Sequence, residues 1–193
     1  NGSEPQGLDP HIVTGVPEHH LLVALCEGLT IANPKGGENL PGVAKSWTIS
    51  PDGKTYTFFL QDNARWSNGD KLTASDFVWS WKRILTPSLG SQYPDMLYYV
   101  TGAPEFHQGL TDDFSSVGVT AVNDTELRVE LTNATPFFIK LLSHYSTYPV
   151  HEETVLKHGA IDDRNGQWTR PGNFVCNGPM NLNTWELNKE ITV

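Results

Sequence analysis

Long apolar runs, basic residues and cysteines are all scarce in this chain of 193 residues. No apolar run approaches the roughly 18 residues that a membrane-spanning helix needs, so we expect no transmembrane segment. No secretory signal peptide is recognisable, and we expect any export signal to have been removed or left out. The 13 basic residues stand against 22 acidic ones, a net charge of −9. This excess disfavours binding to nucleic acid or to anionic membranes, because both are negatively charged.

Only two cysteines are present, Cys26 and Cys176, and they lie far apart in the sequence. They could form one disulfide in an oxidising compartment, or they could remain two buried thiols. The apolar run around Cys26 favours the thiols, because a buried thiol behaves as a small hydrophobic group. The sequence leaves both alternatives open.

Motifs that mark enzyme active sites are also missing. The chain contains no GxSxG, HExxH, GxGxxG or GxxxxGK[ST] pattern, and neither cysteine has a base close to it in sequence. His151 and His158 lie two turns apart in a predicted helix, which is too far for one metal ion. We therefore predict no catalytic residue, no metal site and no cofactor.

Turn residues are plentiful, with 17 glycines and 13 prolines, and hydrophobic periodicity predicts a mixed chain rich in strands. Helices are predicted over residues 18–28, 74–85, 135–144 and 151–159, with Thr135 as the N-cap of the third. Strand pairs are predicted within residues 43–60, 117–131 and 177–193, and a short strand is predicted at 29–32.

The helix predicted over residues 74–85 has the clearest signals. Thr73 is a good N-cap, and Asp76 follows it three residues later. Lys82 and Arg83 lie in the last turns, where positive charge complements the helix dipole. Four apolar side chains recur at helical spacing and are expected inside: Phe77, Trp81, Ile84 and Leu85. We interpret this tryptophan-rich stretch as scaffold rather than as a site of chemistry.

Aromatic residues are the remaining candidates for function. Core packing accounts for most of them, but a few can line a cleft for an uncharged or peptide-like ligand. Tyr93, Tyr98 and Tyr99 are the best candidates, because they lie on short, turn-rich structure where binding groups are common. Trp79 and Trp81 are expected not to line an open cleft.

Four segments of the chain occur in an order and at intervals that are typical of one protein family. They are NGSEPQGLDPH, LCEGL, LPGVAKSWTISPDGKTYTFFLQDNARWSNGDKLTASDFVWSWKRIL and NGPMNLNTWELN. Together they resemble the extracytoplasmic solute-binding proteins of oligopeptide ABC transporters. The likeness runs over the whole chain and rests on several independent motifs.

The resemblance implies an α/β fold of the periplasmic-binding-protein-like type II, here mixed α+β and β-rich. It implies that residues 1–26 and 151–193 belong to a discontinuous first lobe, and that residues 27–150 form an inserted α+β domain. The opposite lobe lies further along in family members and is expected to be absent. We therefore expect a fragment, in keeping with an end in the strand-forming residues 190–193.

The resemblance also implies where a ligand is bound. The backbone after LDPH, which begins at Ile12, is expected to pair with an extended peptide, so that main-chain hydrogen bonds recognise any peptide while its side chains enter wet pockets. The implied binding residues are Val13, Thr14, Gly15, Val16 and Tyr93. Family relatives carry an acidic residue in place of Thr14, and Tyr93 matches a tyrosine that borders their peptide cleft.

The implied function is therefore binding rather than catalysis. An oligopeptide would be bound in the periplasm or at the cell surface and delivered to the permease subunits of an ABC transporter, by a full-length protein that is monomeric. Carriers of murein peptides, dipeptides, metal chelates or sugars share these motifs and remain alternatives. A secreted hydrolase and a pure interaction domain are further hypotheses, and the hydrolase lacks a recognisable nucleophile and base.

Overall fold

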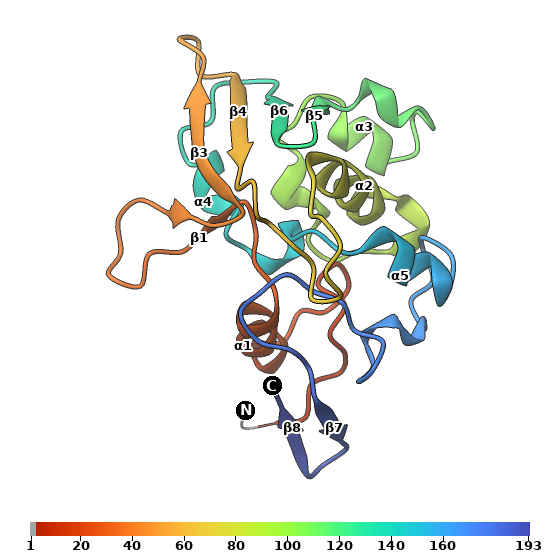
Figure 1. Cartoon of the computed structure of the whole chain (residues 1–193). Coiled ribbons are helices and arrows are strands. Elements are labelled where there is room, and N and C mark those ends of the chain that lie inside the picture. Colours follow the sequence, from red (N-terminus) through yellow and green to blue (C-terminus); the bar gives the residue numbers. More distant parts are fainter. Residues whose placement is uncertain (1–2) are drawn as a thin grey trace.

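A four-stranded antiparallel sheet is the largest sheet of the computed structural model, which describes residues 3–193 (Figure 1). Its strands are β3 (Ala44–Ile49), β4 (Thr55–Leu60), β5 (Val119–Asn123) and β6 (Glu126–Glu130), in the spatial order β3-β4-β6-β5. Both predicted hairpins are confirmed, and pairing of β4 with β6 joins them into one sheet.

Strand β4 shows why one face of this sheet is buried. Tyr56, Phe58 and Leu60 alternate along the strand and are almost completely buried, because successive side chains of a strand point to opposite faces. The turn before β4 contains Gly53 with a φ of 71°, a conformation that glycine adopts without steric cost. The alternation and the turn were both visible in the sequence.

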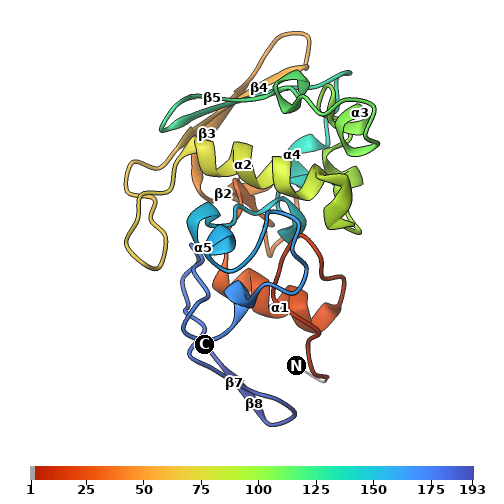
Figure 2. The ribbon, with the colours of Figure 1, turned by 90° about the vertical axis from the view of Figure 1, so that its right-hand side faces the viewer.

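Helix α2 (Ala74–Leu85) packs across the sheet (Figure 2) and has the predicted bounds. The Thr73 N–H donates to the Asp76 carboxylate at 2.6 Å, which satisfies a backbone group at the helix start. The four predicted core side chains are all exposed by 1% or less: Phe77, Trp81, Ile84 and Leu85. Burial of each contributes roughly 1.5–3 kcal/mol, so packing holds this helix in place.

Helix α1 (Val16–Leu25) starts before and ends before the helix predicted over residues 18–28. Its buried apolar side chains, Leu21, Leu22 and Leu25, contribute to a second core. Other members of this core come from distant parts of the chain: Leu8, Tyr145, Tyr148 and Leu182. The helix ends because Cys26 takes an extended conformation, with φ −132° and ψ 159°.

Cys26 and Cys176 form a disulfide, with their Cα atoms 5.4 Å apart. The favoured expectation of two buried thiols is therefore wrong. The two segments are also hydrogen-bonded: Asn177 Oδ1 accepts from the Glu27 N–H at 3.0 Å, and Asn177 Nδ2 donates to the Glu27 carbonyl at 2.8 Å. The apolar run around Cys26 indicated burial correctly, but it carried no information about a partner 150 residues away.

The helix predicted over residues 135–144 is reduced to α4 (Phe138–Leu141). Thr135 does not cap a helix, because its Oγ1 donates back to the Asn133 carbonyl at 2.9 Å. Beyond α4 the backbone bonds span three residues rather than four, as in the bond from the His144 N–H to the Leu141 carbonyl. The segment is a series of turns rather than one helix.

The remaining elements are short. They are β1 (Thr30–Ile31), β2 (Leu40–Pro41), η1 (Pro87–Leu89), η2 (Pro94–Leu97), α3 (Ala103–His107), η3 (Phe114–Ser116), η4 (Tyr145–Thr147), α5 (Glu152–Lys157), η5 (Gln167–Thr169), β7 (Thr184–Glu186) and β8 (Glu190–Thr192). The β7–β8 hairpin confirms the predicted C-terminal strand pair and lies at the end of the molecule away from the sheet (Figures 1 and 2). Within the described chain, every helix is too short or too polar to span a bilayer.

Two large cores organise most of these elements, and a small third cluster is formed by Val150, Val155 and Trp168. The larger lies between the sheet and α2 and draws its buried side chains from residues 29–142. The second surrounds α1 and includes Tyr145 and Tyr148, which fall inside the predicted inserted domain of residues 27–150. The boundaries proposed from the sequence, with residues 1–26 and 151–193 as one lobe, therefore stay a prediction.

Candidate ligand-binding surface

The predicted binding segment, Val13 to Val16, runs along the surface just before and into α1. Thr14 and Val16 are exposed, while Val13 and Gly15 are half-buried. Gly15 is extended, with φ −85° and ψ 157°. Among residues 3–193, the N–H groups of Thr14 and Gly15 and the carbonyl of Thr14 have no hydrogen-bond partner. These main-chain groups are free to pair with another extended chain.

Tyr145 ties this segment to the second core. Its hydroxyl donates to the Val13 carbonyl at 3.0 Å, and burial raises the pKa of that hydroxyl well above its usual range, so it remains a donor at neutral pH. The ring of Tyr93 meets the rings of Tyr145 and His144 edge-on, with centroids 6.2 and 5.1 Å away. Tyr93 is therefore linked to the binding segment through Tyr145.

The other two tyrosine candidates lie elsewhere. Tyr98 is partly buried against the larger core and is tilted toward the ring of His107 at 5.8 Å. Tyr99 is exposed and packs edge-on against Phe137 at 5.2 Å. The structure brings neither tyrosine to the segment that carries Thr14.

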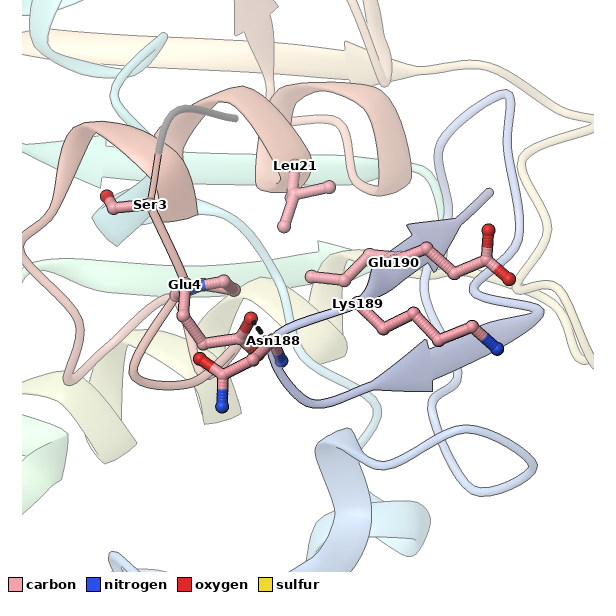
Figure 3. Close-up of a pocket in the computed structure, with 8 residues that line it drawn as sticks. Ser3, Glu4, Leu21, Asn188, Lys189 and Glu190 are labelled. Atoms are coloured by element: carbon pink, nitrogen blue, oxygen red, sulfur yellow. Dashed lines mark hydrogen bonds between the residues drawn. The ribbon is translucent and has the colours of Figure 1, made fainter.

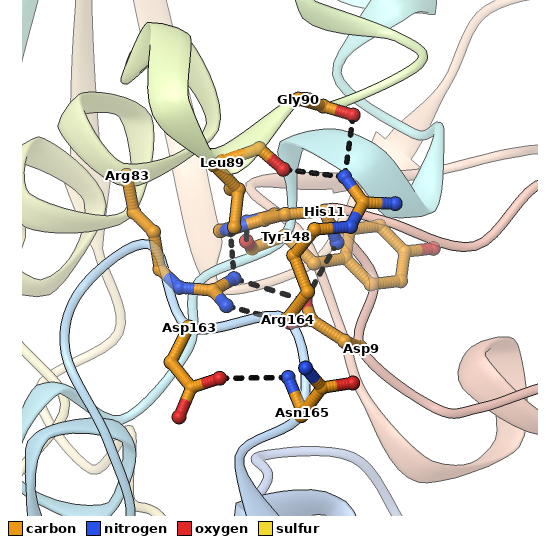
Figure 4. A network of polar contacts seen from close by, with 9 residues as sticks. All are labelled: Asp9, His11, Arg83, Leu89, Gly90, Tyr148, Asp163, Arg164 and Asn165. Carbon is orange, nitrogen blue, oxygen red and sulfur yellow. Dashed lines mark hydrogen bonds and ion pairs between the residues drawn. The ribbon is translucent and has the colours of Figure 1, made fainter.

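A buried ion pair that the sequence analysis missed fixes the start of the binding segment (Figure 4). Arg83 of α2 is completely buried, and its two terminal nitrogens donate to the Asp9 carboxylate at 2.6 and 2.9 Å. Asp9 in turn accepts from the N–H groups of Ile12 and Val13 through its carbonyl, both at 3.1 Å. Arg83 lies in the last turn of α2 as predicted, but the sequence did not indicate that its guanidinium is buried and paired with Asp9.

His11 completes this network. Its Nδ1 accepts from Arg83 at 3.0 Å, which leaves the proton on Nε2 to be donated to the Tyr148 carbonyl at 3.1 Å. Burial, followed by the charge of Arg83, lowers the pKa of His11 to about 4. Burial alone would raise the pKa of Asp9, but the Arg83 charge and hydrogen bonds outweigh it, so that pKa is lowered. At neutral pH the network contains one cation, one anion and one neutral imidazole.

A signal for this network was present in α2. On a helical wheel with 100° per residue, Ser80 and Arg83 lie beside the apolar stripe, both on the same side of it. Both are completely buried, and Ser80 bonds the backbone of Val150. A widened stripe containing an arginine predicts a buried carboxylate partner, but it does not say which of the 22 acidic residues provides it.

Gly15 has a local reason to be glycine. A Cβ at this position would lie 1.9 Å from an oxygen of the Glu18 carboxylate. Glu18 is itself buried, and its other carboxylate oxygen accepts from the Gln6 N–H at 2.7 Å. The binding segment is therefore held close to α1 without a side chain between them.

A polar hollow of about 530 Å³ adjoins the binding segment. Its walls come from the N-terminal segment, from one residue before Tyr93 and from the loop that contains η5: Gln6, Gly7, Leu8, Asp9, Ile12, Val13, Thr14, Gln92 and residues 164–170. Val13 and Thr14 of the predicted site thus border a cavity of ligand size. Gly15, Val16 and Tyr93 lie outside its lining.

The other hollows of the described residues do not involve the predicted site. Trp79 is half-buried and borders a surface hollow of about 470 Å³ together with Val78 and Phe114, so the expectation that it would avoid an open cleft is wrong. Trp81 is buried and donates to the Thr147 carbonyl at 3.1 Å, as expected of a core residue. No residue of the predicted site borders the Trp79 hollow.

A further hollow, of about 420 Å³, lies between the start of the described chain and the β7–β8 hairpin (Figure 3). The Glu4 carboxylate in this hollow is already hydrogen-bonded, because it accepts from Trp185 Nε1 at 2.6 Å and from the Asn188 N–H at 3.1 Å. These bonds attach the hairpin to the N-terminal segment.

One side-chain cluster has the composition of a metal site. Asp70, His151 and Glu153 place potential ligand atoms within 4.8 Å of one another. His151 Nδ1, however, accepts from the Thr154 N–H at 3.3 Å as a helix cap, so Nε2 carries the proton toward Asp70 at 3.2 Å. The cluster is explained by a capping histidine with a carboxylate partner.

Comparison with known proteins identifies the family to which this chain is similar. The chain matches the family model described as bacterial extracellular solute-binding proteins, family 5 Middle, over residues 39–193. It is 41% identical to the periplasmic oligopeptide-binding protein OppA of Escherichia coli over 195 residues, which cover 100% of this chain and 34% of that protein. The chain thus spans about a third of the length of such relatives.

Solved structures agree. The complex of Haemophilus influenzae OppA with the peptide RPPGFSPFR is matched with a TM-score of 0.90 and 36% identity, over 98% of this chain and 36% of that one. The Escherichia coli murein tripeptide-binding protein MppA is matched with a TM-score of 0.86 and 34% identity, over 98% of this chain and 36% of that one. The predicted α/β fold of the periplasmic-binding-protein-like type II is confirmed.

Proposed function

Because the chain belongs to family 5 of the bacterial extracellular solute-binding proteins, we propose that it is part of a protein that binds peptides outside the cytoplasmic membrane and delivers them to an ABC importer. The observation that carries this proposal is the extended Gly15 together with the N–H groups of Thr14 and Gly15 and the Thr14 carbonyl, which are unpaired among the described residues. The names of the relatives support it, since they are binding proteins for oligopeptides and for a murein tripeptide.

The proposed mode of binding is strand addition. An extended peptide lies along Val13, Thr14, Gly15 and Val16 and pairs with the free main-chain groups of Thr14 and Gly15, so affinity comes from hydrogen bonds that every peptide offers. Tyr93 borders the peptide and stiffens the segment through Tyr145. The Asp9–Arg83 pair and the disulfide fix the position of this edge before the ligand arrives, which lowers the ordering cost of binding.

The remaining parts of the proposal follow from the family. Residues 1–26 and 151–193 form part of one lobe, residues 27–150 form an inserted domain, and a further lobe closes over the peptide. The full-length protein is monomeric, works with permease subunits and catalyses no reaction. A murein peptide is the second candidate ligand, because the MppA structure matches the fold nearly as well as the OppA complex does.

Calorimetry on the full-length protein with a mixed pool of tri- to pentapeptides tests the proposal, and a binding heat is expected. Thr14→Pro removes one main-chain donor and is expected to weaken binding about tenfold, since a hydrogen bond of this kind contributes roughly 1 kcal/mol and its loss leaves a ligand carbonyl unpaired. Thr14→Ala is the matched control, because it keeps the N–H, and its affinity should stay within about threefold. Absence of heat with the wild-type protein would contradict peptide binding, and equal affinities of the two variants would contradict main-chain recognition at Thr14.

A further inference from the structure

The polar hollow beside Thr14 contains two arginines, Arg164 and Arg170, that have no acidic partner. Neither forms an ion pair with a carboxylate of residues 3–193. Both are exposed. Two unneutralised cations on one hollow are unusual in a chain whose net charge is −9.

Arg164 is held in place by neutral groups (Figure 4). Its Nη1 donates to the carbonyls of Leu89 and Gly90, the latter at 2.8 Å. Its Nε and Nη2 bond to no other described residue, so one edge of the guanidinium is fixed and the rest keeps its donors. An arginine anchored in this way is ready to bind a carboxylate, because its planar group presents paired donors at little further cost in entropy.

Arg170 is positioned by an aromatic ring instead. Its guanidinium carbon lies 5.2 Å from the centre of the Trp185 ring, a distance at which the cation is attracted to the ring face. This contact uses no hydrogen-bond donor of the guanidinium. Arg170 therefore also retains its donors for a ligand.

Two carboxylates near the hollow are bonded to other groups and not to these arginines. Asp9 is the acidic residue among the hollow's walls, and both of its oxygens are occupied by Arg83. Asp163 lies next to Arg164 in sequence, but one of its oxygens accepts from the Asn165 N–H at 2.8 Å. The other polar walls are neutral and can bond a ligand of either charge: Gln6, Thr14, Gln92, Asn165, Gln167 and Thr169.

We infer that this hollow receives a carboxylate of the bound ligand, held by Arg164 and Arg170, and that the protein prefers peptides that place an acidic side chain or a carboxyl terminus beside Thr14. The inference rests on the proposed function. Side chains on one face of an extended peptide recur about every 6.6 Å, so one of them enters a hollow that begins at Thr14 while the backbone pairs with the segment. The uncharged Thr14 hydroxyl leaves the positive potential of the hollow intact.

The test measures binding of tetrapeptides by calorimetry to the full-length protein. One glutamate is moved through each position of an alanine background, each peptide is compared with its glutamine counterpart, and each is also made with an amidated C-terminus. At one position glutamate is expected to bind about tenfold tighter than glutamine, or amidation is expected to cost about tenfold, because charge-assisted hydrogen bonds are the stronger ones. The first result identifies a side chain as the source of the carboxylate, and the second identifies the carboxyl terminus.

Three variants locate the preference. Arg164→Gln and Arg170→Gln should each reduce the ratio of affinities for the acidic and neutral peptides. Arg128→Gln is the control, because it removes the same charge from an exposed position of β6, far in sequence from the hollow, and its ratio should equal that of the wild type. Peptides that bind with equal affinity in acidic, neutral and amidated form would overturn this inference and leave peptide binding standing. A ratio that is unchanged in both hollow variants would also overturn it, whereas a protein that binds no peptide would overturn the proposed function.

Discussion

The half of the molecule built on the sheet and the half built on α1 are held together by different means. In the first half, α2 and strands β3 to β6 bury apolar side chains against one another. In the second half, polar and covalent ties join segments distant in sequence: Asp9 with Arg83 over 74 residues, and Cys26 with Cys176 over 150. The half that carries the proposed ligand edge is thus positioned by a few specific pairs. A change to one pair is expected to disturb that edge and leave the sheet intact.

The largest effect is expected from Arg83→Met. The variant leaves the Asp9 carboxylate buried without its counter-ion, and breaking a buried pair in this way typically costs about 3–5 kcal/mol. Lys45→Ala is the matched control in the sheet half, because it breaks the exposed pair with Asp62, and loss of a surface pair costs less than about 1 kcal/mol. Urea unfolding measures both free energies of unfolding.

A second measurement separates the two halves. Amide hydrogen exchange of the Arg83→Met protein should show faster exchange at Ile12 and Val13, whose N–H groups bond to Asp9, while β4 keeps its protection. Equal destabilisation by Arg83→Met and Lys45→Ala would show that the buried network contributes no more than a surface pair. Combining Arg83→Met with Asp9→Asn should recover part of the loss, since no charge is then left buried.

A smaller effect, about 3 kcal/mol, is expected from pH through His11. The pKa of His11 is about 4 in the folded protein and near 6.5 unfolded, so the unfolded chain binds more protons between these values. The contribution of His11 to the free energy of unfolding should therefore level off above pH 6.5 and fall as the pH drops toward 4. Asp9 acts in the same direction at lower pH, because its pKa is also lowered in the folded state.

The His11→Gln variant isolates this contribution. Its unfolding free energy should change less with pH between 6.5 and 4 than that of the wild type, although it is less stable at pH 7. Burial also lowers the pKa of His144, so some pH dependence will remain in the variant. Parallel pH profiles for wild type and variant would mean that His11 is not the titrating group.

The sequence predicted the half built on the sheet better than the half built on α1, because the two halves are held together by different kinds of interaction. The bounds of α2, both hairpins of the sheet and the four buried side chains of the stripe all depend on periodicity within a few residues, and all are confirmed. The partner of Arg83, the disulfide and the polar hollow depend on which distant segments meet, and no local pattern encodes that. The predicted site falls between these cases. The resemblance pointed to Val13 and Thr14, and the structure shows a hollow beside them, whereas Arg164 and Arg170 were missed because the loop that carries them has no periodicity.

A third effect on stability, comparable in size to that of His11, is expected from the disulfide. Cys26→Ser combined with Cys176→Ser frees a loop that spans the whole sheet half, and removal of a native disulfide costs roughly 2–4 kcal/mol. The Asn177 and Gly178 hydrogen bonds to residues 25–27 remain, so the two segments should still meet in the folded state. Reduction of the wild-type protein should lower its melting temperature to that of the double variant, and hydrogen exchange should quicken at the end of α1 but not in β4. If β4 exchanged faster as well, the two halves would unfold as one unit. The halves would then differ in the kind of interaction that holds them and not in their stability.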